Sequence, residues 1–380
     1  MNRKLIYLDS FSIDSFHEVF NASSLKMFSC IYNNILYYSS KSSYKAVVNL
    51  APELKSIKHK TLFQFDNYKS SGNAIRHCLA FLYNLITLLF CKKDTAIVIN
   101  FNSLWGLPLL NSIVGKRNLK CLIICHGEME YFFSHQNINR ISRKSLELFL
   151  KESFIPATNL YFCVLGSNIL HNLQQILPAS VSTHFISFEH TFIPRSLNQM
   201  SFSDNSINLA VVGTIRDNQS IEDLICLSTK LKNEGEFKFY ALGRVFCNIS
   251  KLTNAGIITI PNSDKQFVDR SILNSYIDKM DAVILLSQPS GYQATASASI
   301  LEAINNEKYL ICLDSSYNTH IFSLVNPGRI FSSILDIEEF LKTVRKKDLH
   351  SINFQINKKR FTPQYEAGQF KKTLISLNFI

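Results

Sequence analysis

One stretch near the C-terminus, residues 281–313, constrains the fold more than any other part of the chain. A buried strand, Ala282–Leu286, leads through a polar, glycine-containing loop into a helix of small residues that includes Glu302. A second apolar strand, Tyr309–Leu313, follows this helix. Two apolar strands separated by one helix predict a right-handed parallel crossover. Ligands bind such sheets beyond the carboxyl ends of the strands, so we expect the loop 287–297 to lie at a binding site.

The helix that follows this loop is suited to bind an anion. It opens with the small residues Thr295, Ala296 and Ser297, which leave the first backbone N–H groups unobstructed. These N–H groups and the positive end of the helix dipole favour a diphosphate.

Length and composition indicate a globular protein of two domains. The chain has 380 residues, of which 46% are hydrophobic and 18% are charged, so it can bury two full cores. Its nine cysteines include no CxxC pair and no zinc-type spacing, which predicts free thiols in a reducing compartment. No signal peptide is visible, and the apolar run Leu79–Cys91 is shorter than the roughly 20 residues of a spanning helix. We therefore expect a cytoplasmic protein, with this run in a core or interfacial helix.

The net charge of +11 is concentrated in the N-terminal half. Residues 1–200 contain 20 Lys and Arg against 11 Asp and Glu, whereas residues 201–380 contain 20 against 18. A basic half suits nucleic acid or an anionic membrane surface at the inner face of a membrane. Because the sequence has no helix–turn–helix, RRM-like or zinc-finger pattern, we expect no nucleic-acid partner. Lysines scattered over the surface without a partner are the plainer alternative.

Strand-like and helix-like runs alternate through both halves, which predicts an α/β fold with two Rossmann-like domains. We expect these domains at 1–188 and 207–360, joined by a polar linker at 189–206 and followed by a closing helix at 361–380.

In the first domain we expect an interrupted helix over 15–38. Strands are expected at Lys45–Asn49 and Thr61–Phe65, ahead of a long helix at 73–91.

The second domain begins with a strand that ends in Gly213-Thr214-Ile215-Arg216. Glycine at a strand end lets backbone N–H groups approach a phosphate, and an arginine three residues on can fork onto the oxygens of a diphosphate. Gly243-Arg244 ends the next strand and is a second candidate for the same site, although a plain turn explains it equally well.

In the first domain, polar residues follow two strands. The first strand is followed by Asp14, His17, Glu18 and Asn21, of which His17 or Asp14 could act as a base or hold an acceptor. The alternative is that Asp14 or Ser15 caps the next helix.

The apolar strand CLIIC delivers His126-Gly127-Glu128 to its carboxyl end, and His126 is the best functional candidate of this domain. Of Glu128 and Glu130, we expect at least one to be a solvated loop charge. Trp105 is expected to seat the following helix.

These motifs together resemble the GT-B glycosyltransferases. The segment that ends in Leu301-Glu302-Ala303 resembles the nucleotide-sugar site of that family, and Gly213–Arg216 resembles its loop for the leaving nucleotide diphosphate. The strand that ends in His126-Gly127 resembles a recurrent feature whose histidine contacts the acceptor or the transferred sugar. The resemblance implies two Rossmann-like domains that face across a cleft, with the last helix crossing back to the first domain.

The resemblance also implies roles for single residues. Glu302 would bind the ribose hydroxyls of the donor. The other donor contacts would come from Gly213, Thr214, Arg216, Gly243, Arg244, Ser287, Ser297 and Ser299. Catalysis would use His126, His17 and Asp14, and the acceptor side would include Glu18, Asn21 and Glu128. The chain departs from the family at two positions: Ala294 replaces a second glutamate of many retaining members, and Gln219 replaces a lysine.

The resemblance implies a hexosyltransferase of the retaining bacterial polysaccharide or lipopolysaccharide type. A UDP- or GDP-linked sugar would be its donor, and a surface polysaccharide or lipid-linked oligosaccharide its acceptor. Because no DxD motif is present, we expect no essential metal and no cofactor. Two alternatives keep the fold: a nucleotide-sugar epimerase, which needs no acceptor, and a non-catalytic partner that binds nucleotide sugars, towards which Ala294 and Gln219 point.

Overall fold

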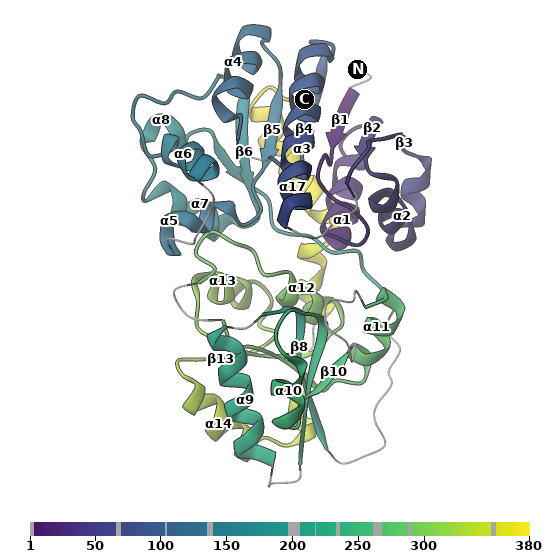
Figure 1. Cartoon of the computed structure of the whole chain (residues 1–380), viewed down its shortest axis with the longest axis vertical. Coiled ribbons are helices and arrows are strands. Elements are labelled where there is room, and N and C mark those ends of the chain that lie inside the picture. Colours follow the sequence, from purple (N-terminus) through teal and green to yellow (C-terminus); the bar gives the residue numbers. More distant parts are fainter. Residues whose placement is uncertain are drawn as a thin grey trace. The chain divides into compact units, whose positions relative to one another are not determined.

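A computed structural model (Figure 1) describes residues 4–65, 70–102, 105–134, 140–196, 206–216, 218–232, 236–260, 268–287, 291–350 and 355–380. The chain forms two compact units. The first contains Met1–Ile193, Ala294–Ala296 and Arg360–Ile380, and the second contains Pro194–Gln293 and Ser297–Lys359. The three-residue segment Ala294–Ala296 in the first unit is a feature that the sequence pattern did not predict.

The first unit is built on a parallel sheet of seven strands in the order β3-β2-β1-β4-β5-β6-β7. The strands are β1 (Lys4–Leu8), β2 (Asn34–Ser39), β3 (Lys58–Thr61), β4 (Thr95–Ile99), β5 (Cys121–Ile124), β6 (Leu160–Val164) and β7 (Phe185–Ser187). The direction of progression reverses between β1 and β4, which pair along Lys4–Leu8 and Thr95–Ile99. Such a switch point opens a crevice for ligands at the carboxyl ends of the two strands.

Helices cover both faces of this sheet. They are α1 (Glu18–Ser29), α2 (Lys41–Leu50), α3 (Ser70–Phe90), α4 (Leu107–Arg117), α5 (Tyr131–Ser134), α6 (Arg140–Leu148), α7 (Ser167–Gln174), α8 (Ala179–Ser182) and the closing helix α17 (Pro363–Ser376). On one face, α1 and α17 share a core in which Phe28 packs edge-on against Phe370 and at a tilt against Tyr7. The crossovers through α1 and α2 lead from β1 towards β3, whereas those through α3 and α4 lead the other way, towards β5. Because parallel crossovers are right-handed, α3 and α4 lie on the face opposite α1.

The second unit contains a parallel sheet of six strands in the order β10-β9-β8-β11-β12-β13. The strands are β8 (Ile207–Ile215), β9 (Phe237–Val245), β10 (Ile258–Ile260), β11 (Ala282–Leu285), β12 (Tyr309–Leu313) and β13 (Gly328–Phe331). The helices are α9 (Gln219–Leu231), α10 (Ile249–Asn254), α11 (Arg270–Asp278), α12 (Ala298–Asn305), α13 (Ser316–Val325), α14 (Ile334–Thr343), α15 (Lys346–Leu349) and α16 (Gln355–Lys358). The predicted α/β fold with two Rossmann-like sheets is confirmed.

Three predictions for the first unit were wrong. Residues 34–39 form strand β2 and not the end of a helix, because their exposure alternates and one face of the strand is buried. The predicted strand Lys45–Asn49 belongs to helix α2, whose first turn is capped by the Ser40 side chain accepting from the backbone N–H of Ser43. Strand β3 precedes the predicted Thr61–Phe65, since it is a polar edge strand without a hydrophobic pattern.

Helix α3 is also longer than the apolar run predicted. It spans 21 residues, and its window Asn73–Phe90 is long and apolar enough to cross a membrane by length and composition alone. The window is longer than the apolar run that begins at Leu79 because it adds residues 73–78. Only 22% of the window is buried inside the protein.

Candidate functional site

In the second unit, the ends of β8 and β9 come together at two glycines. A Cβ atom added to Gly243 would lie 2.0 Å from the carbonyl oxygen of Gly213, which faces it in the sheet register. Gly213 has a φ of +114°, and a Cβ atom there would lie 2.8 Å from Oγ of Ser299. Both positions therefore require glycine. The absence of side chains leaves backbone at the carboxyl edge of the sheet, where a diphosphate can approach closely.

The first turn of α12 lies against this edge. Ser299 Oγ donates a hydrogen bond to the carbonyl oxygen of Val212 over 2.7 Å, which ties the helix start to β8. Ser297 is the N-cap residue, and its buried side chain makes no cap hydrogen bond among the described residues. The first N–H groups of α12 therefore remain available for an anion. The helix begins at Ala298 and not at Thr295, where it was expected to open.

The two predicted arginines meet on one aromatic ring. The guanidinium carbon of Arg244 lies 4.5 Å from the ring centroid of Phe246, and that of Arg216 lies 5.7 Å from it. Two like charges that share one ring repel each other, and an anion bound between them would relieve this repulsion. The sequence analysis missed Phe246, although an aromatic residue two positions after a strand-end arginine was a usable signal.

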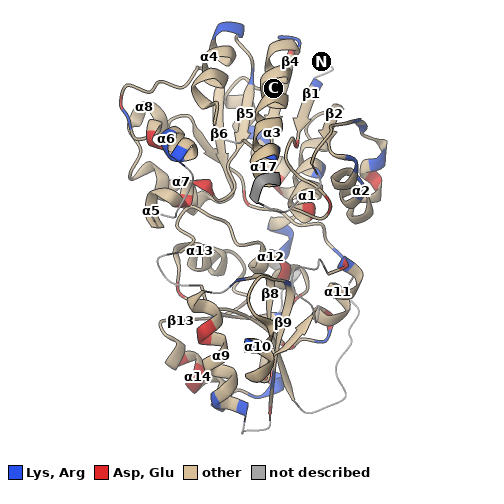
Figure 2. Ribbon diagram, viewed as in Figure 1, with Lys and Arg blue, Asp and Glu red and all other residues tan. Residues whose placement is uncertain are grey.

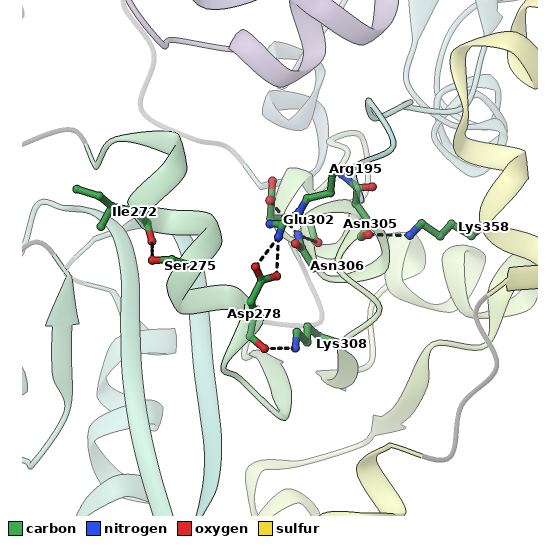
Figure 3. A network of polar contacts seen from close by, with 9 residues as sticks. All are labelled: Arg195, Ile272, Ser275, Asp278, Glu302, Asn305, Asn306, Lys308 and Lys358. Atoms are coloured by element: carbon green, nitrogen blue, oxygen red, sulfur yellow. Dashed lines mark hydrogen bonds and ion pairs between the residues drawn. The ribbon is translucent and has the colours of Figure 1, made fainter. Parts of the chain in front are cut away.

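Glu302 lies in the second turn of α12, where its carboxylate already has two partners, of which Figure 3 shows Asn306. Oε2 accepts from Arg270 over 3.0 Å, and Oε1 accepts from the side-chain amide of Asn306 over 3.1 Å. A carboxylate has about four lone-pair sites, so these contacts leave acceptors for ribose hydroxyls. Arg270 and Asn306 fix the direction of the carboxylate, and neither was predicted from the sequence.

Beside Glu302, a network of polar contacts anchors the start of the second unit (Figure 3). Arg195 donates two hydrogen bonds of 2.6 Å to the carboxylate of Asp278 at the end of α11. Lys308 donates to the carbonyl oxygen of Asp278 over 2.8 Å, and burial lowers the pKa of this lysine. This network positions α11 next to α12 and is structural.

The remaining predicted donor residues lie at strand ends. Thr214 is exposed near the end of β8, and Ser287 is half-buried shortly after β11. Residues 288–290 of the predicted donor loop lie outside the described residues. Gln219, at the family's lysine position, donates to Asp223 one turn on over 2.8 Å and so belongs to the surface of α9.

In the first unit, one predicted acceptor residue has a structural role instead. Asn21 is fully buried, and its side-chain nitrogen donates to Oδ2 of Asp9 over 2.8 Å. Its side-chain oxygen accepts from Asn100 over 2.7 Å, which ties α1 to the ends of β1 and β4. With no exposed surface, Asn21 cannot touch an acceptor. Burial raises the pKa of Asp9, which belongs to the same network.

Two histidines pack against the ring of Phe20 at the carboxyl edge of this sheet, and a third, His17, lies beside one of them. The ring of His126 lies 4.9 Å from that of His17, and Phe20 packs edge-on against His126 at 4.7 Å and against His190 at 5.1 Å. The structure therefore brings the two predicted catalytic histidines together. His126 Nε2 donates to the carbonyl oxygen of Asn100 over 2.7 Å. Because a carbonyl can only accept, Nδ1 of the neutral His126 ring keeps its lone pair.

Asp14 lies on the loop that precedes α1, and Glu18 lies in the first turn of α1. Asp14 is exposed, has a φ of +48°, and its backbone N–H donates to Oγ of Ser42 over 2.9 Å. Helix α1 begins at Glu18 with His17 as its N-cap residue. The alternative that Asp14 or Ser15 caps this helix is therefore wrong.

The carboxylates of Glu128 and Glu130 both hold backbone N–H groups, although at least one of them was expected to be solvated. Glu128 accepts from the backbone N–H of His126 over 2.9 Å, and burial raises its pKa. Glu130 is buried, and its Oε2 accepts from the backbone N–H of Ala294 over 2.7 Å. The expectation that one of these glutamates is solvated was wrong, because both carboxylates hold backbone N–H groups. Glu130 is the residue that holds the segment Ala294–Ala296.

Among the described residues, no group of three or more His, Cys, Asp or Glu side chains is arranged to hold a metal ion. No family model matches the sequence, and no curated protein is recognisably similar to it in sequence.

Several solved structures resemble the chain along its whole length. TarM matches with a TM-score of 0.67 at 10% identity, over 99% of each chain. HepE from Anabaena, in complex with UDP and glucose, matches with a TM-score of 0.64 at 13% identity, over 98% of this chain and 100% of HepE. The lipopolysaccharide outer core galactosyltransferase WaaB matches with a TM-score of 0.61 at 13% identity, over 98% of this chain and 99% of WaaB. The chain has the GT-B fold.

A further cluster of this GT-B chain, at the ends of β1 and β4, was not predicted. Phe11 stacks on Phe101 at 4.0 Å, and His77 stacks on Trp105 at 5.6 Å. Within the part of the chain that the structure describes, both side-chain amide atoms of the buried Asn102 and Nε1 of Trp105 lack a hydrogen-bond partner. A buried polar atom without a partner costs about 1–3 kcal/mol, so a hydroxyl-rich ligand at this edge would stabilise the protein.

The histidines of this GT-B chain predict acid sensitivity. Burial lowers the pKa of both His126 and His190 to about 4, whereas an unfolded histidine titrates near 6.5. As the pH falls below about 6.5, the unfolded chain takes up protons that the folded chain refuses, so stability decreases towards pH 4. At about pH 5 each ring would account for a loss of about 2 kcal/mol in the free energy of unfolding.

Urea unfolding of the wild type at a series of pH values measures this slope. In the double variant His126→Gln/His190→Gln the slope should flatten, whereas in His171→Gln, which replaces an exposed histidine of α7, it should not change. A wild-type slope that persists in the double variant would show that other groups carry the acid sensitivity.

Proposed function

We propose that this GT-B chain is a hexosyl-type glycosyltransferase. It takes a sugar from a nucleoside-diphosphate donor, UDP- or GDP-linked, and transfers it to a surface polysaccharide or a lipid-linked oligosaccharide. In this proposal it works in the cytoplasm at the inner face of a membrane. The second unit binds the donor and the first unit binds the acceptor.

The observation that carries the proposal is the pair of guanidinium groups on Phe246 beside the two glycine strand ends. Arg216, Arg244 and the first N–H groups of α12 form one cationic edge of the second sheet, which suits a diphosphate. HepE, which has the same fold, has been solved in complex with UDP and with UDP-glucose. This likeness supports a nucleotide-sugar donor for this chain as well.

The chemistry follows from the charges that develop during transfer. Departure of the diphosphate leaves an oxocarbenium-like sugar and negative charge on the leaving group. The two arginines are placed to stabilise that charge without reorganisation. In the first unit, the free Nδ1 of His126 would accept a hydrogen bond from a sugar hydroxyl, and low pKa values keep the histidines neutral at pH 7.

An acceptor of glycan type is supported by the cluster around Asn102 and Trp105. Hydroxyl groups both donate and accept, so vicinal sugar hydroxyls can satisfy a side-chain amide and an indole N–H together. TarM has been solved with Fondaparinux, alpha-GlcNAc-glycerol and UDP, and WaaB is described as a lipopolysaccharide outer core galactosyltransferase. These neighbours support a glycan acceptor without identifying it.

Asn102 gives a test that separates a ligand site from a packing site. Because its amide has no hydrogen-bond partner among the residues that the structure describes, Asn102→Ala is expected to leave the free energy of unfolding unchanged or to raise it by about 1 kcal/mol. Asn84→Ala is the matched control, because Asn84 is equally buried but accepts from Ser10 over 2.9 Å and donates to the Phe101 carbonyl. Asn84→Ala should lower the free energy of unfolding by about 1–3 kcal/mol. Urea unfolding would contradict the ligand role if both variants lost equal stability.

The function itself is tested in two steps. Thermal shifts with UDP, GDP and CMP identify the nucleotide, because a ligand that binds only the folded chain raises the melting temperature. Release of that nucleotide from its sugar conjugates, with and without glycan acceptors, then measures transfer. A melting temperature that no nucleotide raises would refute the donor site.

One specific observation keeps a second candidate function open. Ala294 stands where the retaining enzymes that this chain resembles carry a glutamate, and its backbone N–H is held by Glu130. A non-catalytic partner would bind the nucleotide without turnover on any acceptor. An epimerase, in contrast, would convert the donor sugar with no acceptor present.

A further inference from the structure

Helix α3 carries apolar side chains on its outer side and polar ones on its inner side, which is the reverse of an ordinary surface helix. The positions that face the protein recur every four residues and are buried: Arg76, Ala80, Asn84 and Leu88. Two of these four are polar. The opposite side of the helix carries Ile75, Leu82, Ile86, Leu89 and Phe90, which are all exposed. A surface helix of a globular protein normally turns its polar side to water, so this apolar outer face needs a partner.

The buried polar residues show that this orientation is built into the fold. Asn84 accepts from Oγ of Ser10 over 2.9 Å and donates to the carbonyl oxygen of Phe101, at the ends of β1 and β4. Arg76 lies over the ring of Phe11, with its guanidinium carbon 4.8 Å from the centroid. Rotating the helix to hide its apolar side would break these contacts. The outer face of α3 is therefore fixed as a surface.

The loop before the helix extends the same surface. Tyr83 of α3 donates from its hydroxyl group to the carbonyl oxygen of Phe63 over 3.0 Å, which fixes Phe63 beside the helix. The side chain of Phe63 is 68% exposed, and Phe90 at the end of the helix is 81% exposed. We call Phe63 together with Ile75, Leu82, Ile86, Leu89 and Phe90 the outer face of α3.

Positive charge gathers at one end of this outer face. Lys92 and Lys93 follow Phe90 after the single residue Cys91, and both are exposed. Arg117, the last residue of α4, donates to the backbone oxygens of Leu88 and Cys91 and so brings the exposed Lys116 to the same corner. Within the described parts of the chain, Lys92, Lys93 and Lys116 form no ion pair, and helix α3 contains no acidic residue. The exposed Asp94, which follows Lys93, offsets one of these three charges. Figure 2 shows blue ribbon at the turns that follow α3 and α4.

We propose that the outer face of α3 docks on the surface of an anionic lipid bilayer. An apolar stripe of aliphatic and phenylalanine side chains beside unpaired lysines is the pattern of a helix that lies in the membrane interface. The helix does not span the bilayer, because its inner side is bound to β1 and β4 by polar contacts that would be lost in hydrocarbon. The inference deepens the proposed function, since a lipid-linked acceptor would be presented at the same surface.

Sedimentation of the full chain with vesicles tests the proposal without any sugar donor. The wild type is expected to bind vesicles of phosphatidylcholine with about one-third phosphatidylglycerol, and to bind pure phosphatidylcholine vesicles at least about tenfold more weakly. Leu82→Glu/Ile86→Glu should lower binding to the anionic vesicles by more than about tenfold. Leu335→Glu is the matched control, because Leu335 is 65% exposed but lies on α14 in the second unit. It should bind as the wild type does.

The charged corner has its own pair of variants. Lys92→Gln/Lys93→Gln should weaken binding to the anionic vesicles by about 25-fold, which is about fivefold for each of the two charges removed. Lys371→Gln/Lys372→Gln removes an adjacent pair of exposed lysines from α17, on the opposite face of the sheet, and should have little effect. Far-UV circular dichroism and the thermal shift with UDP confirm that each variant is folded.

Three results would overturn the proposal. The wild type could fail to bind anionic vesicles, or the α3 double variant could bind them as well as the wild type. Light scattering could also show a wild-type dimer that becomes monomeric in Leu82→Glu/Ile86→Glu without vesicle binding, which would make a second copy of the chain the partner. None of these results depends on turnover, so vesicle binding and sugar transfer can fail independently.

Discussion

Alanine at Arg244 is expected to weaken the binding of UDP by about 10- to 100-fold, because a charge-assisted hydrogen bond to a diphosphate contributes about 1.5–3 kcal/mol. Arg216→Ala should have a smaller effect, since Arg216 is exposed and farther from the ring of Phe246. Isothermal titration with UDP measures both losses. The double variant Arg216→Ala/Arg244→Ala should lose more affinity for UDP than either single variant.

The control for these arginines is Arg329→Ala. Arg329 is exposed in the same unit and lies 5.1 Å and 5.5 Å from the ring centroids of Phe331 and Phe340, so it repeats the arginine–phenylalanine contact at β13, away from the glycine strand ends. Its removal should leave UDP affinity unchanged. Equal losses from Arg329→Ala and Arg244→Ala would mean that the effect comes from general charge and not from a diphosphate site.

Removal of the Glu302 side chain is the second large effect. If its carboxylate binds the ribose hydroxyls, Glu302→Ala should lower the affinity for UDP by about tenfold or more, and the stabilisation of the protein by UDP should disappear. The loss should be absent for 2′,3′-dideoxy-UDP, which has no hydroxyl groups to contact. Titration of both nucleotides against wild type and variant gives the comparison.

A purely structural role for Glu302 predicts a different pattern. Glu302 pairs with Arg270 over 3.0 Å, so a structural defect should be reproduced by Arg270→Ala and should weaken both nucleotides equally. Equal loss for UDP and its dideoxy analogue in Glu302→Ala would therefore contradict the ribose contact. Glu302 would then serve to connect α12 to α11 through its ion pair with Arg270.

The sequence predicted the parts of the fold that repeat a simple pattern. Buried strands such as Ala282–Leu285 and Tyr309–Leu313 are continuous apolar runs between helices, so their type and order could be read directly. Strand β3 could not be read, because an edge strand made of Lys58, His59, Lys60 and Thr61 has no buried face to mark it. Its neighbour β2 was hidden because its aromatic residues also fit a helix.

The candidate site was predictable only where chemistry follows a strand end. Arg216, Arg244 and His126 could be proposed as candidates because they lie at or just after the ends of apolar strands. Asn21 was misjudged, since an amide in a polar loop looks the same whether it meets solvent or the carboxylate of Asp9. The roles of Asn102 and Glu130 depend on how distant segments come together, such as Glu130 with Ala294 across 164 positions. No local pattern carries that information.

The shared ring of Phe246 has a practical consequence for experiments. Two guanidinium groups that contact the same ring will attract small oxyanions from the solution, so sulfate or inorganic phosphate should compete with nucleotides for the second unit. Affinities measured in phosphate buffer would then be too low. The choice of buffer, and not only the choice of nucleotide, decides whether a screen finds the donor.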